Sequence, residues 1–406
     1  MKQVLLSISL CLAVSVAFAQ KAAVTGAEKM AKDSKGNINE ARNLIKGAMT
    51  NPETKDDAKT WFVAGQVEDA QFNRESTKQI LGQQPNEPVM YEALANALPL
   101  FLKAYELDQR PNEKGKIAPK YAKNIKGILS ANHVYYLNGG GHYLEENDFQ
   151  KSYDMFEQYI EISNLPFFAG EKTAARDENY NTVQFFAAAV AARLDNHELA
   201  IKALNRAKNT PYRQYDVYTY LIFEYDQIKD TVNFEKTLEE GMKLFPDSSI
   251  FILNLINTYI YSDRNDKAID MLNTAINSNP SNPLLYLSLG SVYESGLNDY
   301  KNAETNYLKS LELDPESAVG LLYIGRVYYN QAINRINEAN QLTDVQQYNA
   351  ERELAKVLFR DAIPYFERAH QKDPDNFETM IGLRGCYYQL GMDKEYNEMD
   401  AKIESR

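Results

Sequence analysis

The histidines are the side chains best suited to acid–base chemistry or metal binding in this chain. They are His133, His142, His197 and His370. His133 and His142 share one predicted helix, but nine residues separate them, which puts them on different turns roughly 13 Å apart along the axis. Two side chains that far apart cannot share a metal ion unaided. The sequence therefore predicts no metal site and no cofactor.

Motifs that position a catalytic nucleophile, a zinc ion or a phosphate are absent downstream of residue 19. The chain has no H-E-x-x-H, paired C-x-x-C, G-x-x-x-x-G-K-[ST] or G-x-S-x-G there. Asp and Glu number 56, but a glycosidase holds two carboxyls across a cleft at a defined separation, and no pattern marks such a pair. Residues 263–266 (D-R-N-D) lack the downstream Gly and Glu of a calcium loop and are interpreted as a turn. We expect no catalytic residue; an enzyme built from scattered carboxylates is an alternative.

A repeat of about 34 residues organises the chain. Tyr225, Tyr259, Tyr293 and Tyr328 follow one another at intervals of 34, 34 and 35 residues. Further columns with this period are Pro246, Pro280 and Pro315; Ala200, Phe234, Ala268 and Ala303; Leu204, Leu238, Leu272 and Tyr307; and Ala207, Gly241, Ala275 and Ser310. A fixed period in this range predicts a solenoid of stacked repeats.

The repeat resembles the tetratricopeptide (TPR) family, in which an aromatic residue, Leu-Gly and Tyr on helix A are followed by Ala, an aromatic residue and Pro on helix B. The clearest match is the set Tyr286, Leu289, Gly290, Tyr293, Ala303, Tyr307 and Pro315. The resemblance implies an all-α fold, a right-handed α-solenoid of about eight helix-turn-helix repeats. Each small residue would let two helices approach while a large one fills the gap.

The N-terminus reads as a secretory signal peptide. Residues 1–19 hold one lysine, Lys2, then an uncharged apolar run, with Ala17 and Ala19 before Gln20. This pattern predicts cleavage after Ala19 and a periplasmic or secreted protein. Cleavage would remove Cys11 and leave Cys386 as a buried, inert thiol.

The acidic balance of the chain disfavours nucleic acid and an anionic membrane as partners, since the formal net charge is −12. We expect no membrane insertion after cleavage of the signal peptide. One basic cluster stands out, formed by Lys114, Lys116, Lys120, Lys123 and Lys126. It is either a docking point for an acidic partner or headgroup, or a solvated surface, as charge runs usually are. Glycines 139–141 resemble a phosphate loop, but they fall where helix A of the repeat needs a small residue, and we interpret them as packing residues.

Two insertions interrupt the repeats. We expect divergent repeats over residues 20–180 with a loop insertion at about 73–91. Regular repeats over 181–406 carry a helical insertion at about 331–361 and end in a capping helix at 393–404. Helix B after each insertion contains a proline, Pro99 or Pro364, and we expect a bend at each.

The resemblance also implies a partner-binding groove along the helix A residues. Its predicted members are Phe223, Asp226, Gln227, Asn257, Tyr261, Arg326, Tyr329 and Asn330, with Ile260, Ser291 and Glu294 at equivalent places. The mixture suits an extended peptide with some apolar side chains. The lysine places of the family's carboxylate clamp hold Leu253 and Leu287 here, so we do not expect that mode of binding.

Together these patterns predict a non-catalytic periplasmic scaffold or adaptor. Its partner would be a protein or peptide, in bacterial envelope assembly or transport. A secreted module that binds peptides or glycans is the alternative; helical-repeat proteins that bind glycans usually present tryptophan platforms, and Trp61 is the only tryptophan.

Overall fold

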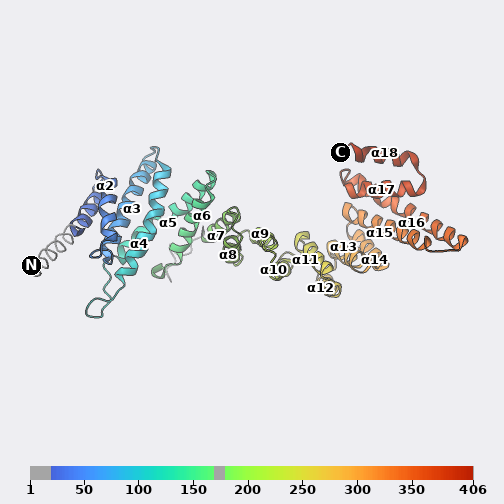
Figure 1. Ribbon diagram of the computed structural model, residues 1–406, viewed down its shortest axis with the longest axis horizontal. Helices are drawn as coiled ribbons and strands as arrows, with labels where there is room; N and C mark the ends of the chain where they lie inside the picture. Colours follow the sequence, from blue (N-terminus) through green and yellow to red (C-terminus); the bar gives the residue numbers. More distant parts are fainter. Residues whose placement is uncertain (1–19, 169–178, 406) are drawn as a thin grey trace, which may run out of the picture. The chain divides into compact units, whose positions relative to one another are not determined.

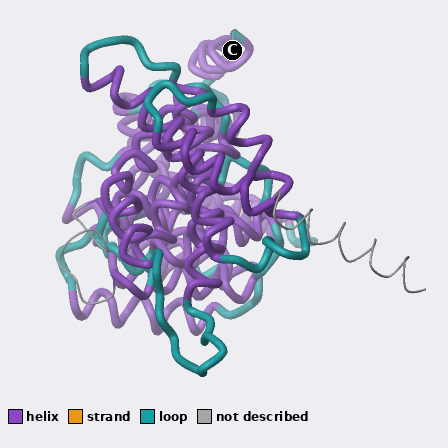
Figure 2. Tube along the Cα trace, turned by 90° about the vertical axis from the view of Figure 1, so that its left-hand side faces the viewer, coloured by secondary structure: helices purple, strands orange, loops and turns teal. Residues whose placement is uncertain are grey.

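A computed structural model describes residues 20–168 and 179–405 of the chain, and these residues form helices and loops without a strand (Figures 1 and 2). The chain divides into two compact units, unit 1 (Met1–Lys229) and unit 2 (Asp230–Arg406). The predicted boundary near residue 180 marks a change in repeat regularity and differs from this division. The predicted signal peptide lies outside the described residues.

Unit 1 consists of helices that pack against one another in chain order (Figure 1). After a helix at residues 20–32 come α2 (Ile38–Thr50), α3 (Ala58–Ile80), α4 (Glu87–Asp108), α5 (Ala122–Glu145), α6 (Phe149–Ser163), the 3₁₀ turn η1 (Pro166–Phe168), α7 (Asn179–Ala191), α8 (His197–Ala207) and α9 (Gln214–Gln227).

Unit 2 continues the same pattern. Its elements are α10 (Thr231–Leu244), α11 (Ser249–Tyr261), α12 (Asn265–Ser278), α13 (Pro283–Ser291), the π-helix η2 (Val292–Gly296), α14 (Tyr300–Leu313), α15 (Ala318–Ala339), α16 (Val345–Lys372), α17 (Phe377–Leu390) and α18 (Asp393–Glu404). In this unit α11, α13 with η2, α15 and α17 are the A helices. The all-α fold predicted from the repeat is confirmed.

A left-handed residue terminates helix A in most repeats. These residues are Asn147, Asp195, Lys229, Asp263, Asn298 and Gly391, with φ between 51° and 68°. In four repeats the next residue caps helix B, its side chain accepting a hydrogen bond from the backbone N–H three residues on: Asp148, Asn196, Asp230 and Asp299. Within each unit the pair reverses the chain, because one residue closes helix A and the next starts helix B. Asp263 belongs to this set, as expected of a turn.

Small residues on helix A face aromatic residues on helix B, also across the insertions. A Cβ atom added to Gly140 would lie 2.3 Å from the Phe156 ring. The corresponding distance from Gly65 to Phe101 would be 2.6 Å, although 36 residues separate these two. Backbone and ring are thus in direct contact, and any side chain at the glycine would displace the helix or the ring.

Both insertions lengthen a helical hairpin. In unit 2, α15 and α16, which contain most of residues 331–361, reach past the end of α17 (Figure 1). In unit 1 the expected loop is shorter than 73–91, because α3 continues to Ile80 and α4 begins at Glu87, which confines the loop to residues 81–86. Asn86 caps α4 by accepting a hydrogen bond from the Val89 N–H. Both α4 and α16 run unbroken through their prolines, Pro99 and Pro364.

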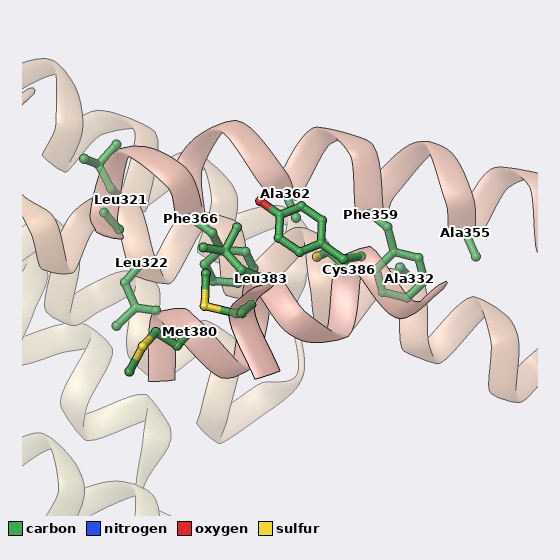
Figure 3. Close-up of a cluster of buried hydrophobic side chains, with 13 residues drawn as sticks. Leu321, Leu322, Ala332, Ala355, Phe359, Ala362, Phe366, Met380, Leu383 and Cys386 are labelled. Carbon is green, nitrogen blue, oxygen red and sulfur yellow. The ribbon is translucent and has the colours of Figure 1, made fainter. Parts of the chain in front are cut away.

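The C-terminal core of unit 2 joins α15, α16 and α17. Figure 3 shows Phe359 and Phe366 of α16 pointing toward Leu383 and Cys386 of α17. Ala332 and Ala355, from the two arms of the extended hairpin, are fully buried in the same cluster. The inserted segment therefore supplies core residues and is not merely an appendage.

The repeated tyrosine reaches the preceding helix B through its hydroxyl. Tyr259 donates to Glu239 Oε1 at 2.7 Å, and Tyr387 donates to Glu367 Oε1 at 3.1 Å. Each pair is 20 residues apart in the sequence. The ring fills the space between repeats while the hydroxyl keeps a polar partner, so this column is explained by packing.

Candidate partner-binding surface

The predicted groove residues divide between the two units. Phe223, Asp226 and Gln227 lie on α9 in unit 1, whereas the other five lie on α11 and α15 in unit 2. All three α9 residues are exposed, Phe223 to 56%. Asp226 forms a surface ion pair with Lys229 at 3.3 Å. We define the helix A face of unit 2 as the exposed and half-buried residues of its A helices.

Two predicted residues of α11 are exposed and unengaged. Asn257 and Tyr261 are four residues apart and therefore share one side of the helix. Tyr261 is 90% exposed. Neither side chain has a hydrogen bond or ion pair within the described residues. An amide that can both donate and accept, beside a free aromatic ring, is suited to a peptide backbone and an apolar side chain.

Arg326 bridges three repeats on the same face. Its Nε and Nη2 atoms donate to the two carboxylate oxygens of Glu294 at 3.0 and 2.9 Å. Its Nη1 atom donates to Glu378 Oε1 at 2.8 Å. Glu378, half exposed, lies at the start of α17. The guanidinium thus ties η2, α15 and α17 together through a bidentate pair and a second, outer pair.

Glu294 is the buried centre of this network, with only 4% of its surface exposed. Besides Arg326 it accepts hydrogen bonds from the Tyr307 hydroxyl at 2.8 Å and from Asn330 Nδ2 at 3.1 Å. A buried carboxylate needs such partners, because leaving it unpaired costs several kcal/mol. Arg326 and Asn330, both predicted to contact a partner, are therefore engaged within the chain.

The surroundings fix the protonation of the network. Burial disfavours the charged form of the Arg326 guanidinium, but the hydrogen bonds and charge of Glu294 outweigh burial and raise the pKa of Arg326 above its ordinary value. Burial and the adjacent Glu294 carboxylate raise the pKa of the Tyr307 hydroxyl. Arg326 stays charged and Tyr307 stays protonated at any ordinary pH, so both act as fixed donors.

A one-residue insertion positions Glu294. Tyr293 and Ala303 are ten residues apart, whereas Tyr259 and Ala268 are nine apart. The extra residue is accommodated in the π-helix Val292–Gly296, which follows α13 directly. A π turn shifts side chains around the helix axis relative to an α-helix. Glu294 lies inside this turn.

Tyr329, the remaining predicted residue, packs internally. Its ring meets that of Phe359 edge-on at 5.3 Å. A Cβ added to Gly385 would come within 2.7 Å of the Tyr329 hydroxyl. Tyr329 therefore connects α15 to both α16 and α17.

Two of the histidines also have partners within the chain. His133 is buried, stacks on the Tyr159 ring at 3.8 Å and lies 3.0 Å from Ser163 Oγ. His197 Nδ1 lies 2.7 Å from the buried Glu224.

Among the described residues, no group of three or more His, Cys, Asp or Glu side chains could hold a metal ion. No helix in the described ranges is long and apolar enough to span a membrane.

The family model of the tetratricopeptide repeat matches residues 284–317. A curated relative, the TPR repeat-containing protein YpiA of Bacillus subtilis, is 26% identical over 185 residues, which is 43% of this chain and 43% of YpiA. These matches show a tetratricopeptide repeat at residues 284–317, and the helix pairs described above repeat the same arrangement along the chain. A fold of such repeats is consistent with a protein-interaction scaffold.

The chains of several solved structures are similar to this one. A TPR protein from Bacteroides fragilis is 16% identical with a TM-score of 0.34, and the match covers 67% of this chain and 99% of that one. MamA is 20% identical with a TM-score of 0.31, over 48% of this chain and 93% of that one. A monomeric mutant of IFIT1, solved with a capped RNA, is 14% identical with a TM-score of 0.40, over 92% of this chain and 74% of that one.

Proposed function

We propose that the protein is a non-catalytic periplasmic scaffold whose unit 2 binds an extended segment of a partner protein along its helix A face. The observation that carries this proposal is the contrast within that face. Asn257 and Tyr261 on α11 are exposed and unengaged, whereas Arg326 and Asn330 on α15 are held by Glu294. Binding would thus centre on α11, and the Glu294 network would keep the neighbouring repeats rigid.

The chemistry of α11 suggests how the segment is held. The Asn257 amide can pair with one peptide group of an extended chain, and Tyr261 can cover an apolar side chain nearby. The Phe223, Asp226 and Gln227 side chains of unit 1 offer a similar aromatic and polar set on α9. Main-chain hydrogen bonds supply affinity in such complexes, and side-chain contacts supply specificity.

Site-specific photocrosslinking in the native cell tests the surface. A photoreactive phenylalanine analogue replaces Tyr261, and Asn277 on α12, an exposed helix B position of the same unit, serves as the matched control. We expect one envelope protein crosslinked from position 261 and absent from position 277. Equal yields from both positions, or none from either, would refute the proposed surface.

The extended hairpin is the competing interface. Deleting residues 331–361 would remove Ala332, Ala355 and Phe359 from the core and would not separate binding from folding. Leu354 and Val357, each 47% exposed, lie three residues apart on α16 and allow a gentler test. If Leu354→Ser with Val357→Ser abolishes capture of the crosslinked partner while Tyr261→Ala does not, the interface is the hairpin.

Two further measurements address compartment and ligand class. N-terminal sequencing of the protein from a periplasmic fraction should begin at Gln20; an intact Met1 would contradict export.

A screen of envelope oligosaccharides, with the protein's fluorescence as the readout of binding, tests the glycan alternative. Saturable binding of a sugar that Tyr261→Ala abolishes would favour a glycan-binding module over a protein scaffold.

A further inference from the structure

The connection between α4 and α5 is long and mostly exposed. It covers residues 109–121, whereas residues 279–282 suffice to join α12 to α13. In Figure 1 this loop extends below the helices of unit 1. Every residue from 111 to 120 is exposed. Packing of the repeats does not account for a loop of this length.

The loop nevertheless has a defined shape. The Asp108 carboxylate accepts hydrogen bonds from the backbone N–H groups of Lys120, Tyr121 and Ala122 at 2.9, 2.7 and 3.0 Å. The Tyr121 ring stacks on Phe62 with centroids 4.7 Å apart. Charge-assisted bonds to three amides anchor the end of the loop where α5 begins.

A tight turn orders the outer part as well. The Asn112 side chain accepts from the backbone N–H groups of Lys114 and Lys116 at 2.9 and 3.1 Å. The Asn112 N–H donates to the Lys116 carbonyl at 2.9 Å. The loop is therefore a preformed projection.

The projection carries uncompensated positive charge. Lys114, Lys116, Lys120 and Lys123 are all exposed and form no ion pair within the described part of the chain, and Glu113 is the one acidic residue among them. Arg110 differs, because Glu106 lies 3.0 Å from it. The rest of the chain is strongly acidic, with a net charge of −12 overall. This charge separation orients the loop toward an anionic surface.

An apolar side chain lies among the lysines. Ile117 is 59% exposed and lies between Lys116 and Lys120 in the sequence. An isoleucine at the outer part of a basic loop gains nothing from a hydrated acidic peptide. It gains from transfer into the headgroup and acyl boundary of a bilayer, as the apolar residues of membrane-bound segments do.

We propose that residues 111–123 bind peripherally to the surface of an anionic lipid membrane, with the lysines at the headgroups and Ile117 inserted between them. This is a second interaction, separate from the helix A face, and would hold the scaffold beside a membrane. Dispersed lysines on a projection fit a fluid layer of negative charge, since each lysine near such a surface contributes about fivefold in affinity.

Co-flotation of the full chain with lipid vesicles tests the proposal. Vesicles of equal parts phosphatidylglycerol and phosphatidylcholine should bind the protein, and vesicles of phosphatidylcholine alone should not. Replacing Lys114, Lys116 and Lys120 by Gln should lower binding about 100-fold. Ile117→Ser should lower it by about tenfold, and an Ile117→Trp variant should show blue-shifted fluorescence on the anionic vesicles.

The matched control replaces Lys35, Lys46 and Lys55, three other exposed lysines of unit 1, by Gln. This variant removes the same charge and should bind vesicles like the original chain. Equal loss in both triple variants would mean that overall charge decides binding, which overturns the proposal. Failure to bind anionic vesicles, or equally tight binding to soluble polyglutamate at the same ionic strength, would overturn it too.

Discussion

Gly290 on α13 lies against the ring of Tyr307 on α14. A Cβ atom at position 290 would be 2.4 Å from Tyr307 Cε1, well inside contact distance. Tyr307 cannot retreat easily, because it is fully buried and its hydroxyl donates to Glu294. A side chain at position 290 that displaced the Tyr307 ring would therefore also disturb the hydrogen bonds of Glu294.

Gly290→Leu should consequently destabilise unit 2. The new side chain must push α13 away from α14 or expel the Tyr307 ring, at a cost of about 3 kcal/mol or more. The melting temperature measured by circular dichroism should fall. An unchanged melting temperature would contradict the close contact between the two helices.

Neighbouring glycines in α5 offer a matched pair. A Cβ on Gly140 would meet Phe156 at 2.3 Å, whereas a Cβ on Gly141 would meet nothing within 4 Å. Gly140→Ala should destabilise by about 1–3 kcal/mol. Gly141→Ala should stabilise by about 0.5–1 kcal/mol, because alanine is the better helix former. Denaturant unfolding of the two variants measures the difference, and shifts of the same sign would refute the assignment.

Arg326→Ala should leave Glu294 buried with only its two neutral donors. Removing one partner of a buried ion pair costs about 3–5 kcal/mol. Arg335→Ala is the control, since Arg335 pairs with Glu351 at 2.7 Å at the surface of the extended hairpin and should contribute about 1 kcal/mol or less. If chemical unfolding showed that both variants lose the same free energy of unfolding, the buried ion pair would contribute no more to stability than the surface pair.

The acid stability of unit 2 should depend on Glu235. Hydrogen bonds from Arg264, and then from Lys267, hold the pKa of this carboxyl below its ordinary value of 4.5. A lowered folded-state pKa gives stability that is complete above the unfolded value and is lost as pH falls through the folded one. Glu235→Gln should therefore lower the melting temperature at neutral pH, and the difference from the original chain should shrink as pH falls below 4.5 through the folded-state pKa. A constant difference at all pH values would contradict this linkage.

Cys386 should resist alkylation in the folded protein. Its side chain is fully buried, and burial raises the pKa of the thiol to about 12, so little thiolate forms at ordinary pH. Iodoacetamide labelling, followed on the peptide that contains Cys386, should be slow in buffer and fast in guanidinium chloride. Rapid labelling of the folded chain would place the thiol at the surface.

Packing between the helices of a repeat could be predicted from the sequence because it depends on residue size at fixed spacing. The contact of Gly65 with Phe101, and that of Gly325 with Phe366 at 2.9 Å, follow from the repeat columns even across long insertions. The extent of the first insertion's loop could not be predicted. Its glycine and prolines indicate a break, but they do not show that helix continues to Ile80 on one side and resumes at Glu87 on the other.

The candidate site was harder to predict. The repeat register places Glu294, Arg326 and Asn330 on the helix A face, but their mutual hydrogen bonds depend on the π turn. The 35-residue interval reveals the extra residue without showing where the helix accommodates it. Glu378 was missed because its contact comes from the following repeat. Tyr329 packs internally because the extended hairpin brings Phe359 beside it, a contact between segments 30 residues apart.

The π turn also shows how this chain tolerates changes in length. One extra residue is accommodated within Val292–Gly296, and the two long insertions likewise fall between the small residue of helix A and the alanine of helix B. In all three repeats the helix pair keeps its glycine-to-ring contact. The junctions at residues 81–86 and 340–344 are consequently places where an epitope, a fluorophore site or a second binding module could be grafted while the repeats on either side keep their alignment.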